Sequence, residues 1–199
     1  MDDAVRAVLE DYHAAMREER LLGPDDVHPR DRLLLPVGED AGQFISILAK
    51  SLTAPTMIEI GTSYGYSGIW LGEAARATGG RLVTMELQDY KAAYARDMAV
   101  RAGVAYYIDF QVGDALALID ALPHGIDFVL LDLWKELYEP CLDAFYPKLN
   151  PGAIIVADNM IFPGGADVAR YGRAVRAKPG MTSVLLPVGQ GLELSRYEG

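Results

Sequence analysis

Side chains suited to a metal site follow two apolar runs of this sequence. Asp132 ends one run, and Asp158 with Asn159 ends another. Two carboxylates and an amide oxygen form a hard oxygen set that suits Mg²⁺ or another divalent cation. Trp134 and Lys135 come directly after the first run. This segment is therefore either a reaction centre or an ordinary strand-to-helix turn whose aspartate caps the next helix.

A second group of polar residues follows earlier apolar runs and favours a nucleoside site. Gly61 and Gly65 bracket a tight turn into a helix, which is also common in any strand-to-helix loop. Glu86 follows at roughly the 20-residue spacing at which a carboxylate accepts the ribose hydroxyls of a nucleoside. Asp114 opens a predicted helix, where it can cap the helix and also face an adenine amino group. Ser63 occupies the third position, where the dinucleotide fingerprint requires glycine, and this weakens a pyrophosphate-binding interpretation.

The two groups of polar residues can form one site only if the fold brings the ends of the strands together. The middle of the chain alternates between apolar runs and helical patterns, which is typical of a parallel sheet with helices on both faces. The predicted strands are 56–61, 81–87, 106–113, 126–132 and 152–158, and the predicted helices are 2–20, 39–52, 67–78, 89–103, 114–122 and 135–149. Pro140 predicts a kink or a separate first turn in the last helix.

The end of the chain differs, because strands at 182–188 and 192–197 are joined by "GQG" and predict an antiparallel hairpin. We therefore predict an α/β fold: a Rossmann-like, doubly wound, mostly parallel seven-stranded sheet with a C-terminal antiparallel hairpin and helices on both faces. In such open sheets ligands bind beyond the carboxyl ends of the strands, where the polar residues lie.

The net charge and composition of the chain limit the classes of molecule that it can bind. The chain has 199 residues and a formal net charge of -10, which argues against general binding of nucleic acid or anionic membranes. The single cysteine, Cys141, excludes an internal disulfide and fits a reducing compartment. The acidic N-terminus does not resemble a signal peptide, and no apolar stretch approaches the ~18 residues of a membrane span. We expect a cytoplasmic protein without nucleic-acid or membrane partners.

In order along the chain, these segments resemble the class I S-adenosylmethionine-dependent O-methyltransferases, in particular the metal-dependent branch of catechol O-methyltransferase and the caffeoyl-CoA O-methyltransferase-like bacterial enzymes. The resemblance covers residues 37–196. It is carried by "EDAGQF", "MIEIGTSYGYS", "VTMEL", "GDAL", "LDLWKELY", "VADNMIFPG" and "LPVGQGLELS". It implies one methyltransferase domain over 1–199, with an N-terminal helical segment at 1–52 and a Rossmann-like core at 56–199.

The resemblance also implies roles for individual residues. Lys135 would be the general base, and Mg²⁺ or another divalent cation would be held by Asp132, Asp158 and Asn159. S-adenosylmethionine would be bound by Val37, Glu59, Gly61, Tyr64, Gly65, Ser67, Glu86, Asp114, Ala115, Asp132 and Trp134. The implied reaction is methyl transfer to one hydroxyl of a catechol-type aromatic diol.

Two residues depart from the family pattern, so the sequence does not identify the methyl acceptor. Leu133 replaces a polar residue that usually stands between the metal aspartate and the tryptophan, and Val184 stands where the catechol enzyme has a carboxylate. A caffeoyl-type acceptor, another hydroxylated natural product, and a non-catalytic cofactor- or nucleoside-binding protein remain alternatives. An irregular surface segment is expected at 23–36, and a basic helix face at 170–178 could receive an acidic substrate tail or a second subunit of a homodimer.

Overall fold

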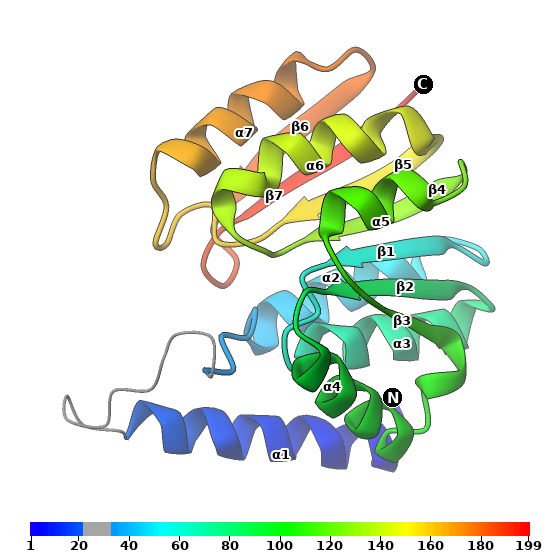
Figure 1. The fold of residues 1–199 in the computed structure, drawn as a ribbon, viewed down its shortest axis with the longest axis vertical. Coiled ribbons are helices and arrows are strands. Elements are labelled where there is room, and N and C mark those ends of the chain that lie inside the picture. The colour runs from blue at the N-terminus through cyan, green and yellow to red at the C-terminus, as the bar shows by residue number, and fades with distance from the viewer. Residues whose placement is uncertain (22–32) are drawn as a thin grey trace.

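The computed structural model describes residues 1–21 and 33–199, which form a sheet covered by helices on both faces (Figure 1). In this part of the chain, seven strands stand in the order β3-β2-β1-β4-β5-β7-β6. The parallel strands are β1 (Thr56–Ile60), β2 (Arg81–Glu86), β3 (Ile108–Val112), β4 (Ile126–Leu131) and β5 (Leu149–Ala157). The remaining two, β6 (Met181–Leu186) and β7 (Leu192–Tyr197), form an antiparallel hairpin, with β7 inserted beside β5. The predicted mostly parallel sheet with a terminal hairpin is confirmed.

Two hydrophobic clusters hold the helices to the sheet. One face is covered by α2 (Glu39–Lys50), α3 (Tyr66–Thr78) and α4 (Asp89–Arg101), and α1 (Asp3–Arg20) packs outside α3 and α4. The other face is covered by α5 (Ala115–Ala121), α6 (Tyr138–Phe145) and α7 (Ala166–Ala177). Neighbouring strand residues face opposite clusters: Met57 contributes to the first and Ile58 to the second. Burial on both faces explains why the parallel strands are almost continuously apolar.

Some element boundaries differ from the prediction. Residues 105–107 form a 3₁₀ turn before β3, so the first two residues of the strand predicted at 106–113 are not in the observed strand. Strand β5 begins at Leu149, three residues before the start of the predicted strand at 152–158, and it includes Pro151. The predicted helix at 135–149 is divided into a 3₁₀ turn at 135–137, α6, and a second 3₁₀ turn at 146–148, so the separate first turn expected from Pro140 is confirmed.

Backbone hydrogen bonds continue the sheet into the residues that follow the strands. Gly61 N donates to Met85 O at 3.0 Å, Asp132 N to Ile60 O at 2.9 Å, and Asp158 N to Leu131 O at 3.1 Å. The residues after β1, β4 and β5 are therefore aligned side by side at one edge of the sheet. No helix among residues 1–21 and 33–199 is long and apolar enough to cross a membrane. Most of the irregular segment predicted at 23–36 lies outside the described residues.

Candidate functional site

The ammonium group of Lys135 lies at the centre of the polar cluster beyond β4 and β5. Its Nζ donates to Asn159 Oδ1 at 2.6 Å, to Tyr138 Oη at 2.6 Å and to Asp132 Oδ1 at 3.2 Å. Tyr138 Oη in turn donates to the backbone carbonyl of Asp158 at 3.0 Å. The structure thus brings together the four residues that the sequence suggested as metal ligands and base, with Tyr138 bridging them.

Asp158 is the least satisfied member of this cluster. It is 1% exposed, and neither carboxylate oxygen has a hydrogen-bond partner. Burial, followed by the charge of Asp132, raises the pKa of Asp158 to about 8. Burial also raises the pKa of Asp132, although the nearby Lys135 ammonium acts in the opposite direction. A buried carboxylate without a partner is costly, so this position is electrostatically incomplete.

The donor set fits a hard divalent cation. Two orphaned carboxylate oxygens of Asp158 lie in a cluster with the Asp132 carboxylate and the Asn159 carboxamide oxygen, and such oxygens are the ligands that Mg²⁺ prefers. Across residues 1–21 and 33–199, nowhere do three or more His, Cys, Asp or Glu side chains gather as a possible metal site. The candidate set is therefore two aspartates completed by an amide, which leaves further positions for water or substrate.

The turn after β1 forms the second half of the site. Gly61 has φ +105°, and a Cβ atom there would collide with the backbone carbonyl of Asp132. Gly65 has φ +89°, and a Cβ atom there would meet Ala95 Cβ at 2.6 Å. Glycine is therefore required at both positions, because the turn is pressed against β4 on one side and α4 on the other.

Hydrogen bonds to the Glu86 carboxylate connect this turn to the end of β2. Its Oε2 accepts from Ser63 N at 2.8 Å, and its Oε1 accepts from Gln88 N at 3.0 Å. Ser63 has φ +47°, a left-handed conformation that the hydrogen bond to Glu86 helps to hold. Each carboxylate oxygen keeps a free lone pair, so Glu86 can still accept from ribose hydroxyls.

Glu59 lies fully buried on β1, beneath the same turn. Burial raises its pKa to about 7, while hydrogen bonds from Ser67 and Thr84 act against this rise, and the charges of Asp132 and Glu86 add to it. Thr84 Oγ1 donates to Glu59 Oε2 at 2.5 Å, whereas Glu59 Oε1 has no partner. This carboxyl group is therefore poised between its charged and neutral forms near neutral pH.

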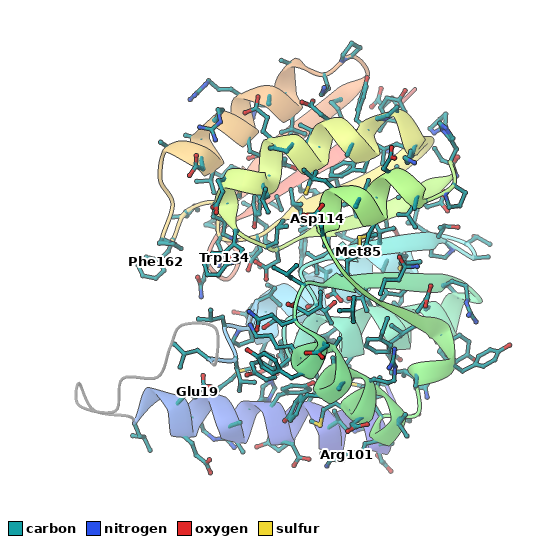
Figure 2. All side chains as sticks on the ribbon, in the orientation of Figure 1. Glu19, Met85, Arg101, Asp114, Trp134 and Phe162 are labelled. Atoms are coloured by element: carbon teal, nitrogen blue, oxygen red, sulfur yellow. The ribbon has the colours of Figure 1, made fainter. Side chains whose placement is uncertain are left out.

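The remaining predicted cofactor residues come from several elements. Tyr64 lies in the turn, where Tyr94 packs edge-on at 5.4 Å between ring centroids, and Val37 is buried in the first cluster. Asp114 caps α5 through Ala117 N at 3.0 Å, which confirms the predicted cap, and Ala115 packs against the second cluster. Trp134 is 47% exposed, and Figure 2 shows it at the same end of the molecule as Phe162, which is 68% exposed.

Two residues of the cluster were not singled out by the sequence. Tyr138 is the first residue of α6, and Gln190 lies at the tip of the β6–β7 hairpin, where its Oε1 accepts from Asn159 Nδ2 at 2.8 Å. Tyr138 lies three residues from Lys135, but its bond to Asp158 spans 20 residues, and the bond of Gln190 to Asn159 spans 31 residues. The sequence spacing alone does not reveal these longer contacts. Leu133, one of the two departures from the family pattern, packs against the second cluster, and Val184, the other, is 49% exposed on β6.

Comparisons with known proteins identify the family of the chain. A family model described as O-methyltransferase matches residues 26–197. The catechol O-methyltransferase of Mycobacterium tuberculosis is 38% identical over 132 residues, which are 66% of this chain and 60% of that protein. The caffeoyl-CoA O-methyltransferase of Mesembryanthemum crystallinum is 30% identical over 186 residues, or 82% of this chain and 73% of that protein.

A solved structure shares the whole fold. The O-methyltransferase TomG from Streptomyces achromogenes, solved in complex with SAM, is 27% identical with a TM-score of 0.77, and the match covers 100% of this chain and 91% of TomG. The match to the mycobacterial catechol O-methyltransferase, in contrast, spans 60% of that relative's length.

Proposed function

The chain belongs to the S-adenosylmethionine-dependent O-methyltransferase family, and we propose that it transfers a methyl group from S-adenosylmethionine to one hydroxyl of a catechol-type aromatic molecule. The observation that carries this proposal is the cluster at the ends of β4 and β5. There, the unpartnered Asp158 carboxylate lies beside a lysine held by Asp132 and Asn159. A structural salt bridge alone does not account for a buried carboxylate left without a partner.

Asp132, Asp158 and Asn159 would hold a divalent cation, preferably Mg²⁺. When bound, the cation supplies positive charge that makes a nearby hydroxyl more acidic and stabilises its oxyanion. Binding of the cation would also reduce the energetic cost of burying the two carboxylates, because it would neutralise their charges within the site.

Lys135 would act as the general base. It would accept the proton of the acceptor hydroxyl, and the resulting oxyanion would attack the methyl carbon of the sulfonium. The carbon–sulfur bond would break as the carbon–oxygen bond forms, leaving S-adenosylhomocysteine. Tyr138 holds the lysine nitrogen at 2.6 Å, which supports this role because a base must stay within reach of the proton it removes. Positioning donor and acceptor in line supplies much of the remaining rate.

The cofactor would lie across the turn after β1. Glu86 would bind the ribose hydroxyls, while Asp114 and Trp134 would flank the adenine. The methionine end would be enclosed by residues of the turn and its surroundings, namely Val37, Glu59, Gly61, Tyr64, Gly65 and Ser67, with Ala115 and Asp132 completing the site. The backbone contacts of Glu86 support this assignment, because they fix the carboxylate before the cofactor arrives.

The acceptor class is drawn from relatives named for catechol and caffeoyl-CoA. The exposed Phe162, three residues after Asn159 of the polar cluster, offers aromatic surface for the acceptor. An aromatic ring stacks readily on such surface, so a ring that carries vicinal hydroxyls fits both the aromatic and the polar parts of the site.

The test is a panel of catechols and caffeoyl-type esters with labelled S-adenosylmethionine, assayed with Mg²⁺ and with EDTA. We expect label transfer to at least one vicinal diol, lost with EDTA and restored by excess Mg²⁺. Undiminished transfer in EDTA would exclude the metal mechanism. Tight S-adenosylhomocysteine binding without transfer to any diol would favour a non-catalytic cofactor-binding protein, and NAD binding in the same titration would favour an oxidoreductase.

A further inference from the structure

The tip of the β6–β7 hairpin holds the loop that follows β5. Met160 N donates to Gly191 O at 2.9 Å, and Ile161 N and Phe162 N both donate to Gln190 O, at 3.0 and 2.9 Å. A Cβ atom on Gly191 would lie 2.6 Å from Ile161 N, so glycine allows this close approach. The loop that begins with Asn159 is therefore fixed by backbone contacts to a hairpin that lies far away in sequence.

The side chain of Gln190 makes a separate contact with Asn159. Gln190 Oε1 accepts from Asn159 Nδ2 at 2.8 Å, and Lys135 Nζ donates to Asn159 Oδ1 at 2.6 Å. The Asn159 carboxamide is thus held at both ends. An ammonium group can only donate hydrogen bonds, so the end facing Lys135 must be the oxygen, and the end facing Gln190 must be the amide nitrogen.

This orientation matters because only the oxygen of a carboxamide binds a hard cation. The oxygen and nitrogen ends have nearly the same shape, so packing alone does not distinguish them. In the reversed orientation, the NH₂ group would face Lys135 and the aspartate cluster. Asn159 also has φ +57°, a left-handed conformation in which few side chains other than Asn and Asp are found. Among the described residues, Gln190 is the acceptor to which Nδ2 is bonded.

We propose that Gln190 is a positioning residue that keeps the Asn159 carboxamide oxygen turned toward Asp132 and Asp158, and thereby sets the affinity for the divalent cation. The inference rests on the proposed function, because it assigns Gln190 to the same metal site. It places the hairpin tip, which carries none of the ligands, among the elements that control metal binding.

The experiment measures Mn²⁺ and Mg²⁺ binding by calorimetry without any acceptor. Gln190→Leu removes the hydrogen-bond acceptor, whereas Gln190→Glu keeps it. We expect Gln190→Leu to bind each cation about 10- to 100-fold more weakly, the range seen when a partner of a metal ligand is lost. Gln190→Glu should retain the wild-type affinity or exceed it. The matched control is Gln111→Leu, on β3, whose side chain bonds Asp109 away from the cluster.

S-adenosylhomocysteine affinity and thermal unfolding are measured on the same samples to show that each variant is folded. If Gln190→Leu does not fold, Gln190→Ala takes its place with the same expectation. Wild-type cation affinity in a folded Gln190→Leu or Gln190→Ala variant would overturn this inference while leaving the metal site intact. Equal weakening in Gln190→Glu and Gln190→Leu would also overturn it, since the acceptor is then irrelevant. A wild-type protein that binds neither cation would instead overturn the proposed metal site, and this inference with it.

Discussion

Glu86 at the end of β2 and Asp158 beyond the end of β5 are both carboxylates of the candidate site, but their surroundings are opposite. Glu86 accepts two backbone hydrogen bonds, from Ser63 and Gln88. Asp158 is not fixed in this way: burial raises the pKa of its side chain to about 8 and outweighs the N–H of the adjacent Asn159, which lowers that pKa. The half of the site between β1 and β3 is therefore satisfied by the polypeptide itself, whereas the half at β4 and β5 is not.

This difference separates two ways of preparing a binding site. The turn side is fixed by the polypeptide, because Glu86 is hydrogen-bonded to the backbone and the two glycines allow the close contacts of the turn. The β4–β5 side contains the buried carboxyl group of Asp158, whose charged form a bound cation would stabilise. We expect substitutions on the turn side to weaken ligand binding. Substitutions on the β4–β5 side should abolish function but increase the stability of the metal-free protein.

The largest expected effect follows removal of the proposed base. Lys135→Ala should lower turnover about 10²- to 10⁴-fold, the usual contribution of general acid–base catalysis, while S-adenosylhomocysteine binding is preserved. Steady-state kinetics and calorimetry measure the two quantities. Lys178→Ala, which removes a surface ion pair with Asp143, is the control and should change neither. Near-normal turnover in Lys135→Ala would remove this lysine from the mechanism.

A smaller effect is expected on the turn side. Glu86→Ala should weaken S-adenosylhomocysteine binding by about 10- to 100-fold, because hydrogen bonds to charged groups contribute ~1.5–3 kcal/mol. Cation affinity should stay at the wild-type value, since Glu86 is bonded to the turn and not to the Lys135 cluster. Calorimetry with each ligand measures both. A parallel loss of cation binding would mean that the two halves are not independent.

The β4–β5 side should show the opposite behaviour. Asp158→Asn removes the unpartnered buried charge, so the metal-free variant should be more stable than the wild type by on the order of 2 kcal/mol at pH 8.5, while cation binding is lost. The gain should be smaller at pH 6, where the wild-type carboxyl group is already protonated because its pKa is about 8. Chemical denaturation in EDTA tests this expectation. A destabilised variant at pH 8.5 would contradict it.

The smallest effect concerns Glu59, whose pKa burial raises to about 7. A raised pKa means that the folded protein binds the proton more tightly than the unfolded chain. Its stabilising contribution is present below about pH 4.5 and is lost as the pH rises through 7. The stability of the wild type relative to Glu59→Gln should therefore fall by about 1–3 kcal/mol between pH 5 and pH 8 in metal-free protein. A difference independent of pH would show that Glu59 keeps one protonation state throughout.

Much of the fold could be predicted because strands such as β4 are buried on both faces and so read as continuous apolar runs. The start of β5 could not be predicted, because Pro151 and Gly152 favour turns and the pairing with β4 is irregular there: Leu149 pairs with Ile126, and the next paired residue is Ile154, opposite Phe128. The tyrosines at 106–107 have strand-forming side chains, yet they lie in a 3₁₀ turn that precedes the paired residues of β3.

The candidate site could also be predicted only in part. Its charged residues could be identified from their positions after strands, since parallel strands must end at one edge. The residues that hold these charged side chains in place could not be predicted. The contacts of Tyr138 with Asp158 and of Gln190 with Asn159 depend on how α6 and the hairpin are packed. Side-chain orientation is set by tertiary structure, and strand pattern alone carries little information about it.

The insertion of β7 between β5 and β6 has a consequence for how the protein is made. The hydrogen bonds between Glu86 and the turn after β1 join residues that are synthesised early and need nothing from the second half of the chain. The loop after β5, in contrast, gains its hydrogen bonds to the hairpin only when the hairpin has left the ribosome and β7 has paired with β5. A nascent chain can therefore form the contacts of Glu86 well before the contacts that hold Asn159, which depend on the last strand.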